Sequence, residues 1–219
     1  ARCYTCSMIL KERDVMIDLE TLATSPDSVI ITIGALRFDP YANDRDRNVQ
    51  DMTNFYTRID PGSFDYPEAE ISDDTMAWWA KQSPEAQHEA FGEGVARMDI
   101  RDALDALFDF CKPCDRVWAN GPAFDIIILE TAARRLGKRV PWNFWQVRDV
   151  RTIFDLGINP NRPATTAHNA LADAEAHHED HFTVDGHEYP VKETTTLEDI
   201  AKLAGIAVEG RDYGDNEIN

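Results

Sequence analysis

The pair Asp18 and Glu20, at the end of an apolar run that begins at Val15, constrains this chain more than any other feature. Such a run is typical of a buried strand. Side chains two apart along a strand point to the same side, so the two carboxylates project together. Two carboxylates this close repel each other unless a hard cation lies between them. The pair is therefore a candidate metal site at the end of a strand, where open α/β sheets bind their ligands.

Asp-x-Glu is a weak signal by itself, because the chain has 40 acidic residues and the pattern recurs at Asp173 and at Asp215, where a solvated surface pair explains the Asp215 copy. Two later features strengthen the Asp18 copy, namely Asp125 and the segment that runs from His168 to Asp173. Together these positions supply four carboxylates and one imidazole. Their order along the chain is the one that a two-metal nuclease needs.

Length and composition indicate one folded domain. A chain of 219 residues with 43% hydrophobic residues can bury a sizeable core. No apolar run is long enough to span a membrane, and the N-terminus lacks a signal-peptide core. We therefore expect a cytoplasmic protein without a membrane partner, either bacterial or made by a phage inside its host. The oligomeric state is left open, a dimer included.

The net charge of −18 argues against a protein that coats DNA, because phosphate binding depends on lysine and arginine. The charge is unevenly distributed, however. Residues 134–151 contain six basic residues and one acid, whereas residues 173–199 contain nine acids and one lysine. A basic strip on an acidic body suits an enzyme that holds a short length of nucleic acid. A solvated helix end rich in arginine explains residues 134–139 equally well.

Four cysteines form two Cys-x-x-Cys pairs, Cys3 with Cys6 and Cys111 with Cys114. Two such pairs can hold a structural zinc ion. Reduced thiols are the simpler expectation for an intracellular protein. Met8 resembles a natural start, which leaves open whether the residues before it are native.

The hydrophobic pattern predicts three strands followed by alternating helices and strands. The expected strands are residues 15–19, 28–38, 54–59, 116–119 and 146–150. The expected helices are residues 74–81, one from Pro84, and residues 101–110, 126–136, 151–156, 169–178 and 197–204, with a hairpin at 183–189. This order indicates an α/β domain with a mixed sheet flanked by helices.

Three motifs resemble those of the DnaQ-like 3′→5′ exonucleases: Asp18 through Thr21, Asn120 through Asp125, and His168 through Asp173. The His-x-x-x-x-Asp spacing of the third motif resembles the DEDDh branch, which includes the proofreading subunit and ribonuclease T. Residues 75–86 and 145–152 resemble the phage exonuclease A group and its exonuclease VIII-like bacterial relatives.

The resemblance implies a ribonuclease H-like sheet of strand order 3-2-1-4-5, with the first motif on the central strand. It also implies two divalent cations, Mg²⁺ or Mn²⁺, and release of 5′-mononucleotides from a 3′ end. Asn120 and Gly121 depart from the His-Asn that relatives often carry. We divide the chain into an N-terminal extension (1–13), a DEDDh exonuclease domain (14–182) and an acidic C-terminal hairpin and helix (183–219).

Each candidate residue has an expected role. Carboxylate oxygens suit Mg²⁺ and Mn²⁺, so Asp18, Glu20, Asp125 and Asp173 are the expected ligands. We expect Asp18 to bridge the two metals, Glu20 and Asp173 to hold the metal of the catalytic water, and Asp125 to reach the other ion through water. His168 is the expected general base, because an imidazole accepts a proton near neutral pH.

Substrate contacts are expected from residues within or directly after the first two motifs, and from two arginines. Leu22 and Phe124 are candidates to wedge against the terminal bases, and Thr21 to contact the backbone. Of Trp78 and Trp79, we expect one in the core and leave the other open. The further candidates for substrate contact are Asn120, Arg148 and Arg151.

Three functions remain open on the sequence alone. A metal-dependent 3′→5′ exonuclease acting on single-stranded DNA ends is favoured. The alternative within enzymes is an exoribonuclease that trims RNA 3′ tails, because the contacts that read the 2′-hydroxyl cannot be identified. The remote alternative is an acidic, non-enzymatic interaction protein, which would have no use for His168.

Overall fold

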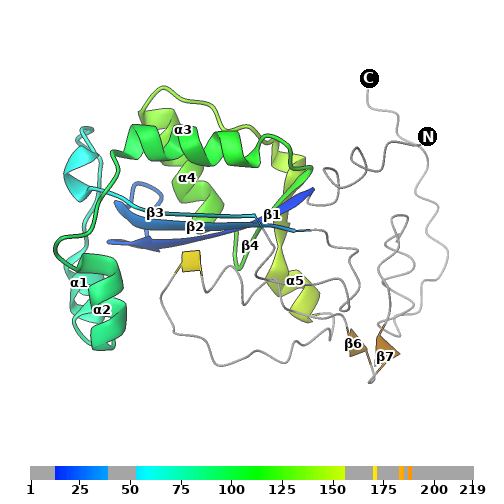
Figure 1. Cartoon of the computed structure of the whole chain (residues 1–219), viewed down its shortest axis with the longest axis horizontal. Coiled ribbons are helices and arrows are strands. Elements are labelled where there is room, and N and C mark those ends of the chain that lie inside the picture. Colours follow the sequence, from blue (N-terminus) through cyan, green and yellow to red (C-terminus); the bar gives the residue numbers. More distant parts are fainter. Residues whose placement is uncertain (1–12, 39–52, 156–169, 172–182, 185–186, 189–219) are drawn as a thin grey trace, which may run out of the picture.

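The computed structural model describes residues 13–38, 53–155, 170–171, 183–184 and 187–188. These contain a five-stranded mixed sheet of order β3-β2-β1-β4-β5 (Figure 1), as predicted. The first three strands pair antiparallel, whereas β4 runs parallel to both β1 and β5. The strands are β1 (Asp14–Thr21), β2 (Ile30–Phe38), β3 (Asn54–Arg58), β4 (Arg116–Ala119) and β5 (Val147–Asp149).

The predicted helices within the described residues are confirmed to within about two residues at each end. The α-helices are α1 (Asp73–Trp79), α2 (Pro84–Phe91), α3 (Ile100–Cys111), α4 (Asp125–Arg135) and α5 (Val150–Asp155), and the 3-10 turns are η4 (Pro61–Ser63) and η5 (Phe144–Gln146). Local chemistry sets these boundaries. The Ser72 hydroxyl caps α1 by accepting from the Thr75 N–H. Gly137, with φ of +69°, ends the turn that follows α4.

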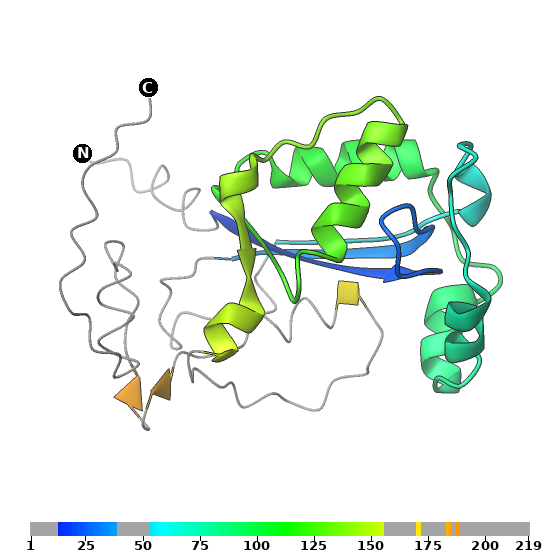
Figure 2. The same cartoon turned by 180° about the vertical axis from the view of Figure 1, so that it is seen from behind.

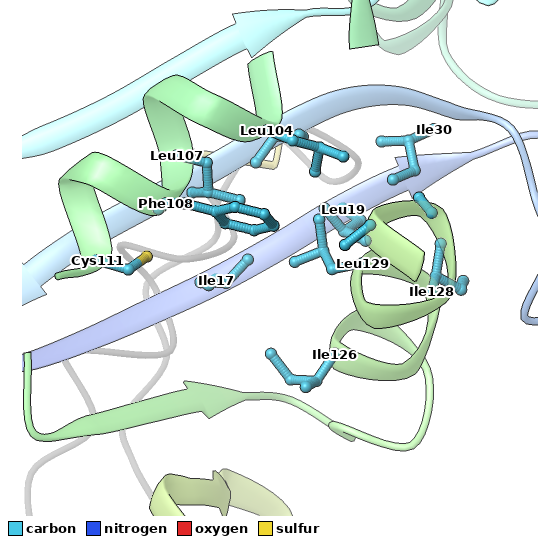
Figure 3. Close-up of a cluster of buried hydrophobic side chains, with 14 of the residues drawn as sticks. Ile17, Leu19, Ile30, Leu104, Leu107, Phe108, Cys111, Ile126, Ile128 and Leu129 are labelled. Atoms are coloured by element: carbon cyan, nitrogen blue, oxygen red, sulfur yellow. The ribbon is translucent and has the colours of Figure 1, made fainter. Parts of the chain in front are cut away.

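One face of the sheet is covered by α3 and α4 (Figures 1 and 2). Ile17 and Leu19 of β1 point into this layer, where they pack with Leu107 and Phe108 of α3 and Leu129 of α4 (Figure 3). Burying a side chain of this size contributes roughly 1.5–3 kcal/mol. The layer makes β1 a rigid central strand.

Alternation sends Met16, Asp18 and Glu20 to the opposite face. Helix α5 packs there through Val150, which joins the small cluster around Met16. Helices α1 and α2 pack near the far end of β1, in the cluster that contains Leu22. Both views place α1, α2 and α5 on the side of the sheet away from α3 and α4 (Figures 1 and 2). The two carboxylates thus lie along β1 between two apolar clusters.

Several predictions fall wholly or partly outside the described residues. The expected helix 169–178 is described only at 170–171, which are helical. The hairpin is described as two short antiparallel strands, β6 (Thr183–Val184) and β7 (His187–Glu188). The helix at 197–204 lies outside, so the division at residues 13 and 182 stays a prediction. No helix in the described ranges is long and apolar enough to cross a membrane.

Candidate active site

Asp18 and Glu20 lie two residues apart on the side of β1 that faces away from α3 and α4. Asp18 lies opposite Gly34 of β2, and Glu20 lies opposite Thr32. Asp18 is half-buried and Glu20 is buried. The register between β1 and β2 shifts directly after Glu20. Irregularities of this kind bend a strand and often lie beside functional sites. Here the shift marks the end of the regular strand at the carboxylate pair.

Asp125 is bound to the same stretch of β1 by one hydrogen bond. The pairing of β1 with β4 ends at Met16, so the N–H of Leu19 has no partner from that strand. The Leu19 N–H instead donates to Oδ1 of Asp125 over 3.1 Å. Leu19 lies between the two carboxylates of the first motif. The carboxylate of the second motif is therefore fixed to the backbone that carries the first.

Burial perturbs the ionisation of Asp125. The side chain is 4% exposed. Removal from water raises the pKa of Asp125 to about 7, while the N–H groups of Leu19 and of Asp125 itself and the charge of Arg151 act in the opposite direction. A carboxylate that burial holds partly protonated near neutral pH gains its full charge when a cation binds beside it.

Arg151 lies over the turn that leads into α4. Gly121 has φ of +104°, and a Cβ there would lie 2.4 Å from Nη1 of Arg151. Only glycine both adopts this backbone and leaves room for the guanidinium. Arg151 is exposed and its charge acts on Asp125. Asn120 and Phe124, which flank this turn, are half-buried.

Gly34 is the seat of residues 170–171, the described part of the third motif. A Cβ on Gly34 would lie 2.2 Å from the carbonyl carbon of Ala170 and 2.3 Å from the nitrogen of Leu171. The backbone of this segment thus rests directly on β2, opposite Asp18 (Figure 1). An isolated glycine in a strand is the sequence signal for such a close approach. We did not predict this role of Gly34 from the sequence.

His168 and Asp173 lie outside the described residues, so their roles stay predictions. They flank the segment seated on Gly34 in the sequence. Among the residues that are described, no group of three or more His, Cys, Asp or Glu side chains is placed to hold a metal ion. The donors at hand are all carboxylate oxygens, which is the chemistry that a hard cation prefers. The described carboxylates fit such an ion in the type of their donor atoms.

Residues 13–182 match the family described as 3′-5′ exoribonuclease Rv2179c-like domain. The chain belongs to this family. An exodeoxyribonuclease of Enterobacteria phage T4 is 28% identical over 166 residues, covering 64% of this chain and 69% of that protein. The chain is accordingly a 3′-5′ exonuclease that acts on nucleic acid, and the predicted DnaQ-like relationship is confirmed.

Two solved structures are similar in fold. The zinc-bound E. coli ExoI–ssDNA complex matches with a TM-score of 0.52 and 14% identity. The match covers 75% of this chain and 38% of that chain, so the exonuclease described here spans well under half of ExoI. The RNase domain of the yeast Pop2 protein gives a TM-score of 0.45 at 14% identity, over 77% of this chain and 76% of that one. The first likeness supports the fold alone, and the second is too weak to add to it.

Thr21 and Leu22, two of the predicted substrate contacts, have different surroundings in the structure. The Thr21 hydroxyl donates to the carbonyl of Ala23 over 2.7 Å, and the Thr21 carbonyl accepts from Trp79 Nε1 over 2.9 Å. Leu22 is buried in the cluster with Trp79. Both residues adjoin the site, but Leu22 contributes to the core, and its role as a wedge stays a prediction.

Arg148 is not directed at the carboxylates. Its Nη1 donates to the carbonyls of Trp145 and Val147, over 2.6 Å and 2.9 Å. The guanidinium is therefore engaged by the main chain beside β5. Of the two arginines predicted to contact substrate, Arg151 is the one whose charge acts on Asp125.

Two basic residues at the end of α4 and just beyond it, Arg135 and Lys138, are paired with acids. Arg135 forms ion pairs with Asp27 and Glu68. Lys138 pairs with Asp105. These contacts attach the end of α4 to neighbouring segments and engage two of the four basic residues of 134–139 with carboxylates. The structure favours the solvated helix end for this stretch and counts against a long basic groove.

The second cysteine pair is buried at the end of α3. Cys111 and Cys114 are not joined in a disulfide, and burial raises the pKa of the Cys111 thiol. A thiol held in its neutral form is a poor nucleophile and a poor ligand. Cys3 and Cys6 lie outside the described residues, so the zinc site that all four would form stays untested.

Proposed function

We propose that this exonuclease removes nucleotides one at a time from single-stranded 3′ ends and releases 5′-mononucleotides. The observation that carries the proposal is the Leu19 N–H bound to Asp125, which holds the first two motifs together as one acidic site. DNA is the leading substrate, on the likeness to the phage T4 exodeoxyribonuclease. RNA is the second candidate, on the description of the family as exoribonucleases.

Enzymes of this family generally depend on divalent metals, and we propose two Mg²⁺ or Mn²⁺ ions held by Asp18, Glu20, Asp125 and Asp173. Bound between these carboxylates, the cations would activate a water and offset the charge that develops at the phosphoryl group. Two observations support the ligand set. The donors are all oxygens, and burial penalises a charge on Asp125 that a neighbouring cation would stabilise.

The remaining chemistry falls to side chains of the protein. His168 would accept the proton of the attacking water, and its place two residues before Ala170 puts it close in sequence to the segment seated on Gly34. Arg151 would bind a non-bridging phosphate oxygen, because its exposed guanidinium lies beside Asp125 and a planar fork suits a phosphate.

Matched DNA and RNA oligonucleotides, labelled at the 5′ end and sampled over time, test the proposal. A descending ladder on DNA that stops when the cations are chelated supports it, and a ladder on RNA alone moves the substrate to the second candidate. The Asp18→Asn variant should be inactive, whereas Asp74→Asn, an equal charge change on exposed α1, should not. Cleavage of closed circles would contradict exonuclease action on either sugar. A cytoplasmic location stays a prediction.

A further inference from the structure

Helix α1 is attached to the residues that directly follow the catalytic strand. The indole Nε1 of Trp79 donates to the carbonyl of Thr21 over 2.9 Å. The N–H of Ser72, which caps α1, donates to the carbonyl of Leu22 over 2.9 Å. Thr21 is next in sequence to Glu20. The position of α1 is therefore set by the end of β1, and anything on its surface keeps a fixed relation to the catalytic carboxylates.

An aromatic pair leads from this attachment to the surface. Trp79 is 1% exposed, whereas Trp78 is 41% exposed. Their ring centroids lie 5.1 Å apart at an interplanar angle of 78°, so the Trp78 ring is supported edge to face by a buried neighbour. Met76 of the same helix and Ile71 before it are also exposed. The partly exposed Trp78 ring thus packs on Trp79, and Trp79 is hydrogen-bonded to the carbonyl of Thr21.

The charges around this indole decide which part of a nucleic acid it can contact. Asp73 and Asp74 occupy the first turn of α1, and the one basic residue that follows the helix closely is Lys81, whose N–H donates to the carbonyl of Trp78 over 3.0 Å. Two carboxylates against one ammonium give this surface no net attraction for a phosphate. A nucleobase is uncharged and presents a flat π-face, which stacks well on an indole. An exposed indole beside carboxylates is suited to a base and unsuited to a backbone.

We propose that Trp78 stacks an unpaired nucleobase of the substrate strand, upstream of the nucleotide whose bond is cut. The inference rests on the proposed function and adds a specific contact to it. A base within a duplex has its faces covered by its neighbours, so this contact selects single-stranded ends. In this proposal Trp78 contacts a base of the substrate, and Arg151 contacts a phosphate.

The test is an abasic scan combined with substitution of Trp78. Single-stranded oligonucleotides carry one abasic residue at successive positions from the 3′ end, and degradation is followed with wild type, Trp78→Ala and Trp78→Phe. The control is Trp145→Ala, because Trp145 is more exposed, at 60%, but lies at η5 before β5 and has no bond to β1. Thermal unfolding midpoints of all variants establish that each is folded.

For Trp78→Ala we expect KM to rise roughly 5- to 150-fold, the range found for loss of one stacked base, with kcat within about twofold. Trp78→Phe should keep most of the affinity, and Trp145→Ala all of it. Wild type should lose affinity when the abasic residue takes the position of the stacked base, and Trp78→Ala should be indifferent to it. The effect of Trp78→Ala should not change with salt, since no charge is involved.

An abasic profile that is the same in Trp78→Ala as in wild type would overturn the inference, as would an equal rise of KM in Trp145→Ala. A change of molecular mass in sedimentation on Trp78→Ala, with an unchanged abasic profile, would assign the indole to an interface between copies instead. Failure of wild type to degrade any oligonucleotide defeats the proposed function itself. Binding of the same oligonucleotides to Asp18→Asn, measured by fluorescence anisotropy, then still decides the role of Trp78.

Discussion

Replacement of Asp125 by asparagine should stabilise the protein in the absence of divalent cations. The asparagine side-chain oxygen can still accept from the Leu19 N–H, so the contact over 3.1 Å is kept and only the buried charge is removed. Burial raises the pKa of Asp125 to about 7. An aspartate in an unfolded chain has a pKa of about 3.9. Between these values the native protein holds a proton that the unfolded chain has lost, so the free energy of unfolding falls as pH rises through this window.

The size of the effect follows from the two pKa values. A separation of about three units corresponds to roughly 4 kcal/mol once pH exceeds 7, and to about 1.5 kcal/mol at pH 5. In chelator, Asp125→Asn should therefore exceed wild type in free energy of unfolding by up to these amounts, with the gap widening from pH 5 to pH 8.5. Excess Mn²⁺ should reverse the order, because only the carboxylate gains from the cation.

Urea unfolding followed by tryptophan fluorescence at a series of pH values measures the gap directly. The control is Asp74→Asn, which removes an equal charge from an exposed position on α1 and should show no widening with pH. A variant that is less stable than wild type at pH 8.5, or a gap that stays constant with pH, would refute the reasoning. Either result would mean that Asp125 is charged in the folded protein without help from a cation.

Three further outcomes are expected. Gly34→Ala should lower activity by an order of magnitude or more with little loss of folding stability, because a Cβ would lie 2.2 Å from the backbone of Ala170. Oligonucleotide degradation and thermal unfolding measure the two effects. Full activity would contradict the close contact between Gly34 and residues 170–171. Arg151→Ala should raise KM and reduce the slope of log affinity against log salt by about one, whereas Arg139→Ala, an exposed charge beyond α4, should change neither. His168→Ala should lose activity near neutral pH, regain part of it as pH rises, and bind Mn²⁺ as wild type does in calorimetry; a loss of Mn²⁺ binding would make His168 a ligand.

The local elements were predictable because their signals are local. The apolar run from Val15 predicts β1, and the serine before α1 predicts where that helix begins. The strand order has a different origin. It pairs residues more than a hundred positions apart, such as Val15 with Val117, and hydrophobic periodicity has no information about such partners. That part came from the resemblance to known exonucleases.

The site was predicted as a set of residues and not as a geometry. Nothing local to Asp125 indicates that its carboxylate accepts from Leu19, because the gap it fills is created by the early end of β4. The pairing of Arg135 with Asp27 likewise depends on where α4 ends relative to a distant loop. Charge counted along the sequence therefore overstated the basic strip.

Binding of Mn²⁺ to Asp18→Asn and Asp125→Asn tests most directly whether the carboxylates of β1 and α4 form one metal site. Calorimetry of wild type should show divalent binding that either substitution weakens at least tenfold, with parallel loss of the degradation ladder, while Asp74→Asn matches wild type. The Leu19 N–H holds the two ligands together, so both variants should fail alike. Wild-type affinity for Mn²⁺ in both variants, with the ladder retained, would contradict a shared metal site.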